Sequence, residues 1–310
     1  MEKIGIVIHG GAGPDSEFIK KHKQEYEEGL RKALDKGYEV LKNKGKAIDA
    51  VEAAVNELEN NPIFNAGRGS AINAKGEVEM CASIMNGQNL NSGAVAIVKN
   101  VRNPVSLAKA VMLNTSHIYL GGEGALNYAK SINIELEPES YFVTEHQYDA
   151  YAKKRKEAYA SNRHIAMEQI HERSHGTVGA VALDHEGNIA AATSTGGTEF
   201  CKEGRIGDSS MIGVGSYADN STCAVSTTGD GEYLIRGVIA HSVSNVMKYT
   251  KADVQEAARK VIFEENKDAE GDMGVIAIDR DCNIAIEFNS ARMHRGWKTP
   301  KGTGVGIYKD

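Results

Sequence analysis

The feature that most constrains the fold is an abrupt change of character at residues 176–177. Residues 145–175 are charged and contain no glycine, whereas residues 178–183 read Val-Gly-Ala-Val-Ala-Leu. That small apolar run predicts a buried strand, and the segment before it predicts a solvated helix or a mobile tether. Thr177 therefore stands first in a core strand. It either opens the strand as a β-branched residue suited to a pleated surface, or acts as an N-terminal nucleophile whose freed α-amino group is the base.

Composition excludes several classes of function. The chain has 310 residues, of which 41% are hydrophobic and 25% are charged, which is typical of a globular protein with a substantial core. No linker rich in Pro, Gly and Ser divides it, so we expect one domain over residues 1–310. The net charge of -6 comes without a basic stripe, which argues against nucleic acid and anionic membranes as partners. Small molecules or peptides fit better.

The cysteines and the N-terminus indicate the compartment. Four widely spaced cysteines form no CxxC pair, so neither a disulfide framework nor a zinc ribbon is predicted. The apolar run at residues 4–8 is too short for a secretory signal. We therefore expect a cytoplasmic protein whose first core strand lies there.

The remaining periodicities predict antiparallel hairpins and paired helices. Apolar residues at helical spacing predict helices at residues 17–44, 49–58, 104–113, 124–130, 233–247 and 252–264. Strands are predicted at 4–8 and 94–98, hairpins at 71–83, 178–193 and 274–288, and a glycine-rich turn at 9–14. Strands and helices do not alternate as in a βαβ array, so we expect an α+β fold with two sheets covered by helices.

One short motif suggests a metal site. His171, Glu172 and His175 match HExxH, in which two histidines one helical turn apart bind zinc and the glutamate activates water. That function needs a buried helix at a cleft, but this segment is charged, has no strong apolar face and ends at a glycine. Solvated residues of the tether fit it better, and a zinc peptidase remains an alternative.

Threonine-rich strand ends in the C-terminal half favour a different chemistry. Residues 193–197, 204–209 and 227–232 bring together hydroxyls, open backbone N–H groups, a guanidinium and a carboxylate. Arg205 and Asp208 could hold both charged ends of an amino acid, the arginine binding its carboxylate and the aspartate its ammonium group. A surface ion pair between them is an equally good explanation.

Six motifs follow one another along the chain: His9-Gly10-Gly11-Ala12-Gly13, Phe64-Asn65-Ala66-Gly67-Arg68-Gly69-Ser70, Gly176-Thr177-Val178-Gly179-Ala180-Val181-Ala182, Ala192-Thr193-Ser194-Thr195-Gly196-Gly197, Gly204-Arg205-Ile206-Gly207-Asp208 and Ser226-Thr227-Thr228-Gly229. Together they resemble the plant-type (type 2) asparaginases, which are also isoaspartyl (β-aspartyl) peptidases, within the N-terminal nucleophile (Ntn) hydrolases. The resemblance covers nearly the whole chain.

The resemblance implies a four-layer αββα sandwich and a precursor that cuts itself between Gly176 and Thr177. The products would be an α subunit of residues 1–176, with a mobile linker from about residue 140, and a β subunit of residues 177–310. The family also suggests a dimer of αβ units.

The resemblance also implies a role for each matching residue. Thr177 would be the nucleophile, Thr195 would assist it, and the Thr228 hydroxyl with the Gly229 N–H would form the oxyanion hole. The other implied roles are substrate binding by Arg205, Asp208, Asn65 and the backbone of Gly229 and Gly231, and self-cleavage involving Gly10 together with Gly176 and Thr177.

No cofactor is implied for catalysis, but the resemblance implies a structural sodium ion. Its ligands would be the backbone carbonyls of Leu58, Glu59, Asn61, Phe64, Ala66 and Arg68. Family members commonly carry aspartate at two positions where this chain has Cys81 and Asn86.

The implied activity is hydrolysis of the side-chain amide of L-asparagine and of β-aspartyl dipeptides, with release of L-aspartate. Three alternatives remain. A glycosylasparaginase-like amidohydrolase would be expected to carry a signal peptide and disulfides. The zinc peptidase is the second. The third is an uncleaved protein that binds acidic amino acids, if Cys81 or Asn86 disables maturation.

Overall fold

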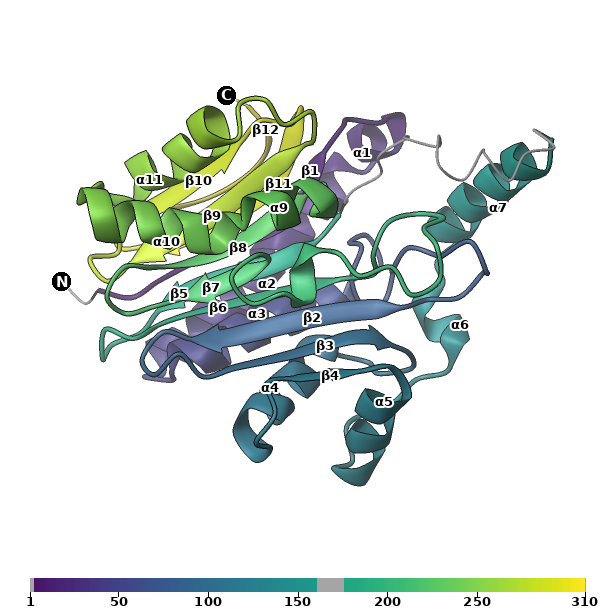
Figure 1. Ribbon diagram of the computed structural model, residues 1–310, viewed down its shortest axis with the longest axis horizontal. Helices are drawn as coiled ribbons and strands as arrows, with labels where there is room; N and C mark the ends of the chain where they lie inside the picture. The colour runs from purple at the N-terminus through teal and green to yellow at the C-terminus, as the bar shows by residue number, and fades with distance from the viewer. Residues whose placement is uncertain (1–2, 161–175, 310) are drawn as a thin grey trace.

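The computed structural model describes residues 3–160 and 176–309, which form two sheets between layers of helices (Figure 1). The strands are β1 (Gly5–Gly13), β2 (Met80–Asn86), β3 (Ser92–Val98), β4 (Tyr119–Gly121), β5 (Val178–Leu183), β6 (Ile189–Thr195), β7 (Ser216–Ala218), β8 (Cys223–Gly229), β9 (Met273–Asp279), β10 (Ile284–Phe288), β11 (Arg292–Thr299) and β12 (Gly302–Tyr308).

The described helices are α1 (Glu17–Lys21), α2 (Lys23–Lys42), α3 (Ala47–Asn60), α4 (Pro104–Asn114), α5 (Gly122–Ser131), α6 (Glu139–Phe142), α7 (Glu145–Ala160), α9 (Gly231–Gly237), α10 (Ile239–Thr250) and α11 (Val254–Lys260). A π-helical turn, Val261–Glu265, extends α11, and Asp208–Ser210 forms a 3₁₀ turn.

The larger sheet has eight strands in the order β12-β11-β1-β5-β6-β2-β3-β4, and the smaller has four in the order β10-β9-β8-β7. The neighbouring strands pair antiparallel, except β3 and β4, which are parallel. The predicted α+β class with two mostly antiparallel sheets is therefore confirmed.

Strand alternation explains the four layers, because successive side chains on a strand point to opposite faces. On β1, Ile6 and Ile8 pack in the core under α2 and α3, while Val7 packs between the two sheets. On β9, Val275 packs under α10 and α11, while Ile276 enters the space between the sheets. Three apolar cores therefore separate helices, sheet, sheet and helices (Figure 1).

The predicted hairpins at 178–193 and 274–288 are confirmed as β5–β6 and β9–β10. The two turns close in the same way. In each, an aspartate, Asp184 or Asp279, begins the turn, and its Oδ1 accepts backbone N–H groups two and four residues later. An Asx turn of this kind fixes the register of the flanking strands.

Of the hairpin predicted at residues 71–83 only the turn at Lys75-Gly76 forms, where the Asn73 N–H donates to the Glu77 carbonyl at 2.9 Å, and strand pairing begins only at Met80. Residues before it bond to a distant loop instead: the Ile72 carbonyl accepts from the Phe200 N–H, and the Ala74 N–H donates to the Cys201 carbonyl, both at 2.8 Å. The residues do alternate, but Ile72 and Ala74 find their backbone partners in Phe200 and Cys201, more than a hundred residues away in the sequence.

The glycine-rich turn predicted at 9–14 is also wrong, because these residues continue β1. A bulge between His9 and Ala12 interrupts the register with β11, and Gly11 there has φ +113°. Glycine lets a strand bulge without ending. The same residues thus keep β1 in the sheet while bending it beside Thr177.

Helix α7 begins the segment expected as a tether. Its Tyr151 ring lies 5.8 Å from that of Phe200, and Lys154 pairs with Glu199 at 3.3 Å. The predicted HExxH residues 171–175 lie outside the described part of the chain. In residues 3–160 and 176–309, no helix has the length and apolarity needed to cross a membrane.

Candidate active site

Thr177 lies at the start of β5, a central strand between β1 and β6. Thr177 is an even number of residues from Val181 and Leu183, whose side chains fill the space between the two sheets. Its side chain therefore points to the same face of the larger sheet. Its exposed fraction is 5%. The sheet therefore holds Thr177 at the end of the inter-sheet space.

The bond before Thr177 meets the hydroxyl of a second threonine. Thr195 ends β6, and its Oγ1 donates a hydrogen bond to the carbonyl oxygen of Gly176 at 3.2 Å. On the other side, a Cβ added to Gly176 would lie 2.9 Å from the Cβ of Asn65, so the close approach requires glycine. The carbonyl is thereby polarised and held in one position.

The carbonyl of Thr177 is held by a buried histidine. His9 Nδ1 lies 2.9 Å from the Thr177 oxygen, and Nε2 lies 2.8 Å from the hydroxyl of Ser226 on β8. Burial lowers the pKa of His9 to about 3, so the ring is neutral. Because a carbonyl only accepts, Nδ1 carries the proton and Nε2 accepts from Ser226. His9 thus joins the two sheets directly behind Thr177.

The end of β8 supplies the next group. Thr228 is fully buried, and its Oγ1 accepts from the Ala12 N–H at 3.1 Å. Gly229 has φ +133°, and a Cβ there would lie 2.1 Å from the Asp272 carbonyl oxygen. Only glycine fits this backbone. The structure therefore brings the ends of β5, β6 and β8 together, as the threonine-rich strand ends predict.

Arg205 and Asp208 lie beside these strand ends, but they do not form the pair considered from the sequence. Arg205 is held by Glu232, with Nε–Oε1 at 3.0 Å and Nη2–Oε2 at 2.9 Å. Asp208 is 3% exposed and accepts from the Thr227 hydroxyl at 3.1 Å. A Cβ on Gly231 would lie 2.8 Å from Arg205 Nη2 and 3.1 Å from Asp208 Oδ1. The Arg205 guanidinium and the Asp208 carboxylate therefore both face the backbone of Gly231.

Burial raises the pKa of Asp208, whereas the ion pair with Glu232 decides the pKa of Arg205. The pKa of Asp208 rises to about 6, although Arg205 and the Thr227 hydroxyl oppose the rise. The pKa of Arg205 is raised above its ordinary value by Glu232, which outweighs the lowering by burial. The Arg205 guanidinium, held by Glu232, thus lies near the Asp208 carboxylate. Among residues 3–160 and 176–309, no cationic group lies at hydrogen-bond distance from that carboxylate.

The comparisons with known proteins agree on one family. A family model described as asparaginase matches residues 1–307. The chain belongs to this asparaginase family. Isoaspartyl peptidase of Escherichia coli (strain K12) is 40% identical, covering 100% of this chain and 98% of its own length. Isoaspartyl peptidase/L-asparaginase of Xenopus laevis is 41% identical, covering 98% and 94%, and that of Mus musculus is 41% identical, covering 93% and 86%. The Ntn-hydrolase sandwich predicted from the sequence is the fold of this asparaginase family.

The sodium loop implied by the resemblance to asparaginases stays a prediction. The loop closes on itself, with the Arg68 N–H donating to the Glu59 carbonyl at 2.7 Å, and Gly67 and Gly69 have positive φ. The carbonyls of Leu58 and Asn61 also accept backbone bonds. A carbonyl has two lone pairs, so these bonds are compatible with a cation.

A cluster of carboxylates elsewhere in the described residues could also hold a metal. It consists of Glu77, Glu79 and Glu203. Lys99 pairs with Glu77 at 2.7 Å, and Lys75 pairs with Glu203 at 2.9 Å. Lysines therefore already neutralise this surface cluster.

The two departures from the asparaginase pattern lie at opposite ends of β2. Cys81 is buried near the site, and burial raises the pKa of its thiol. Asn86 shapes the β2–β3 turn, where its Oδ1 accepts from the Gln88 N–H at 3.0 Å. Five residues of strand separate them by roughly 16 Å, so Cys81 alone adjoins the reacting groups.

Sequence reasoning missed three residues of this asparaginase site, namely His9, Ser226 and Glu232. His9 and Ser226 both stand inside motifs that were singled out for their glycines and threonines. Glu232 follows the Gly229-Asp230-Gly231 turn by one residue, and its pairing with Arg205 spans 27 positions. The alternation of side chains along β1 could have placed His9 between the sheets, but a charge pair between a loop and the first turn of α9 leaves no periodic signal.

Proposed function

We propose that the chain cuts itself before Thr177 and that Thr177 then hydrolyses the side-chain amide of L-asparagine and of β-aspartyl dipeptides. The family membership supports the hydrolase class, and the names of the relatives above support both substrates. The observation that carries the proposal is the hydrogen bond from Thr195 to the Gly176 carbonyl at the head of a central strand.

Self-cleavage begins when the Thr177 hydroxyl attacks the Gly176 carbonyl carbon. The hydroxyl loses its proton, the C–N bond to Thr177 breaks, and the amide nitrogen takes up a proton to become the free amine. The resulting Gly176 ester is hydrolysed by water, which leaves a carboxylate on Gly176 and restores the hydroxyl. The Thr195 hydroxyl favours the first step because it donates to the oxygen that gains negative charge.

Turnover uses the new amine as the base. A free α-amino group has an ordinary pKa of about 7.7 to 8.0, so part of it is unprotonated near neutral pH. It accepts the hydroxyl proton of Thr177 while the hydroxyl attacks the amide carbonyl of the substrate. Thr228 and the Gly229 N–H stabilise the oxyanion, ammonia or an amine leaves, and water then releases L-aspartate.

Arg205 and Asp208 orient the substrate. The Arg205 guanidinium binds the substrate α-carboxylate, and Asp208 binds its α-ammonium group. Glu232 keeps the guanidinium in place through two hydrogen bonds, and a preorganised donor loses less entropy when the ligand binds. Asparagine and β-aspartyl dipeptides present the same two charged groups, so one clamp serves both. The proposal keeps a dimer of αβ units as its assembly.

The test is to replace Thr177 and follow both reactions. Thr177→Ala is expected to leave a single chain of 33.4 kDa by intact mass and to abolish turnover of β-aspartyl dipeptides. Thr177→Ser keeps a hydroxyl and is expected to retain both reactions at reduced rates. A Thr177→Ala protein that still hydrolyses these dipeptides would refute the proposal.

The alternatives give different results. A zinc peptidase would lose activity with a chelator and with Glu172→Gln, neither of which affects a threonine mechanism. A glycosylasparaginase-like enzyme would prefer glycosylated asparagine over β-aspartyl dipeptides in steady-state kinetics. An uncleaved binding protein would remain one chain in the wild type and bind aspartate without turnover.

A further inference from the structure

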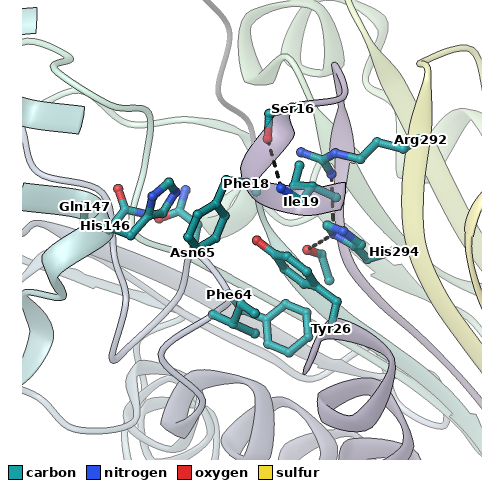
Figure 2. Close-up of a pocket in the computed structure, with 13 residues that line it drawn as sticks. Ser16, Phe18, Ile19, Tyr26, Phe64, Asn65, His146, Gln147, Arg292 and His294 are labelled. Carbon is teal, nitrogen blue, oxygen red and sulfur yellow. Dashed lines mark hydrogen bonds between the residues drawn. The ribbon is translucent and has the colours of Figure 1, made fainter. Parts of the chain in front are cut away.

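A small polar pocket lies behind the Gly176–Thr177 bond. Its volume is about 60 Å³, the space of roughly two water molecules. Figure 2 shows Arg292 and His294 on one side of it and Asn65, His146 and Gln147 on the other, with Phe18 and Tyr26 between. Gly10 and Gly176 also line the pocket. It therefore touches the bond that self-cleavage would break, but no role has been assigned above to Arg292, His294 or Gln147.

The pocket contains a buried cation without a matching anion. Arg292 is 5% exposed. Its Nε donates to the Pro14 carbonyl at 2.9 Å, and its Nη1 lies 3.4 Å from His294 Nδ1. Within residues 3–160 and 176–309, Asp15 and Asp272 act on it only from beyond ion-pair distance. A buried guanidinium is costly unless a negative group pairs with it.

His294 adds an unused polar atom. It is 2% exposed and stacked on the Tyr26 ring at 4.1 Å. Its Nδ1 lies 3.2 Å from the Gly10 carbonyl as well as near Arg292, while its Nε2 has no hydrogen-bond partner. Burial and Arg292 hold the pKa of His294 well below its ordinary value. Because the Gly10 carbonyl only accepts, the neutral ring carries its proton on Nδ1, and Nε2 is left as an acceptor without a donor.

These groups select the ligand. The Arg292 guanidinium is a donor, so the ligand must accept hydrogen bonds, and its buried positive charge favours an anion. The side-chain amide of Gln147 also lacks a partner on Oε1, and turned by half a rotation it presents N–H groups. The volume admits one planar group of a few atoms. A carboxylate meets all three requirements.

We propose that this pocket is a carboxylate-binding site and that it takes the C-terminal carboxylate of Gly176 once the bond to Thr177 has been cut. The inference rests on the proposed self-cleavage for its ligand, because hydrolysis of the Gly176 ester by water creates that carboxylate. Gly176 already lines the pocket, so the new terminus is present at high effective concentration. Its capture moves an anion away from the Thr177 amine and leaves that amine free to act on substrate.

Formate is the probe for the site itself. In the uncleaved Thr177→Ala protein the pocket has no carboxylate, and NMR titration with ¹³C-formate is expected to show binding that depends on Arg292. Adding Arg292→Gln should weaken it at least tenfold. Arg295 provides a matched control, since it is a buried arginine on the same strand that packs over Phe288 instead. Arg295→Gln should change formate affinity less than twofold.

Two further variants separate binding from folding. Arg292→Lys keeps the charge and should retain most of the formate affinity. His294→Phe keeps a ring against Tyr26 but removes the unprotonated Nε2, which cannot donate to a carboxylate, and should change formate affinity less than about twofold. Both are compared only after thermal unfolding shows intact folding. Equal formate affinity in the Thr177→Ala protein with and without Arg292→Gln would overturn the site.

The cleaved protein identifies the occupant. In cleaved wild type, Gly176 should fill the pocket, so the Arg292-dependent formate binding disappears and a carboxypeptidase removes Gly176 slowly. In cleaved Arg292→Gln, removal of Gly176 should be at least tenfold faster, as read from the intact mass of the α chain. Equal rates of removal would overturn the Gly176 assignment.

The other source of a carboxylate is the amino acid that leaves a β-aspartyl dipeptide. Then cleaved wild type would still bind formate through Arg292, and Arg292→Gln would raise KM for the dipeptide but not for asparagine. That result would also overturn the Gly176 assignment. If wild type remains a single chain, the proposed function fails, and the formate titration still decides whether the site exists.

Discussion

Cys81 is the direct cross-strand partner of Thr195 in the β2–β6 pair. Directly opposed residues project to the same face of a sheet, so the thiol lies beside the hydroxyl that reaches the Gly176 carbonyl. The charges of Arg205 and Asp208 both act on it. The residue at this position therefore sets part of the electrostatic environment of both the cleavage bond and the substrate clamp.

Replacing Cys81 by aspartate is expected to shift the pH dependence of turnover. A second carboxylate near Asp208 raises the pKa of Asp208, because like charges disfavour each other. The acid limb of kcat/KM should move to higher pH by about one unit, measured with a β-aspartyl dipeptide. Cys81→Ser adds no charge and should leave the limb in place. An unchanged or lower midpoint in Cys81→Asp would contradict this.

The wild-type acid limb should itself reflect Asp208. Burial raises the pKa of this carboxyl to about 6, and only its ionised form attracts the substrate ammonium group. Protonation of the Thr177 amine already lowers kcat/KM as pH falls below about 8, and protonation of Asp208 below about 6 should add a further decline of roughly tenfold per unit. The limb in kcat should lie at lower pH, because bound ammonium favours the carboxylate. Asp208→Asn should remove this second decline and most of the substrate affinity while leaving the decline due to the amine, and a second decline that persists in that variant would assign it to another group.

Removing the Thr195 hydroxyl should slow self-cleavage. Thr195→Val keeps the shape but deletes the donor to the Gly176 carbonyl, and loss of one such donor typically costs about a hundredfold in rate. The cleaved fraction over time, from intact mass, measures it. Thr195→Ser keeps the donor and serves as the control. Cleavage of Thr195→Val at the wild-type rate would show that the hydrogen bond has no part in the step.

Gly176→Ala should slow cleavage through shape alone. The added Cβ would lie 2.9 Å from the Asn65 Cβ, a contact that forces the scissile carbonyl to shift away from Thr195. We expect at least a tenfold slower appearance of two chains on denaturing gels. Gly124→Ala in α5 is the matched control, because a Cβ there meets nothing within 4 Å. If both variants mature alike, the close fit at Gly176 does not matter.

Local patterns predicted the elements whose partners are near in sequence. The β5–β6 and β9–β10 hairpins follow from alternating apolar residues around Asx turns, and α2 follows from apolar residues at helical spacing, such as Leu30 and Leu34. Residues 71–79 form the predicted turn but no strand pair, because the backbone of Ile72 and Ala74 bonds to Phe200 and Cys201. A backbone hydrogen bond between distant loops is invisible to any short window of sequence.

The candidate site was predicted in the same uneven way. The threonines at the ends of β5, β6 and β8 were found because a hydroxyl-rich strand end next to glycine is a local pattern. The Arg205–Glu232 pair was not, since it joins a loop to the first turn of α9, 27 positions later in the sequence. Arg292 and His294 likewise gave no signal, because they share a pocket with Gly176 only after β11 pairs with β1.

The strand order has a consequence for what cleavage can do to the assembled molecule. In the larger sheet, strands from before and after Thr177 alternate in blocks: β12 and β11, then β1, then β5 and β6, then β2, β3 and β4. After a cut at Thr177, three strand pairs, β11–β1, β1–β5 and β6–β2, therefore join the two fragments by backbone hydrogen bonds within one continuous sheet. The two fragments would comigrate in native chromatography, and once separated in denaturant they could reassemble only by a bimolecular reaction whose rate depends on concentration.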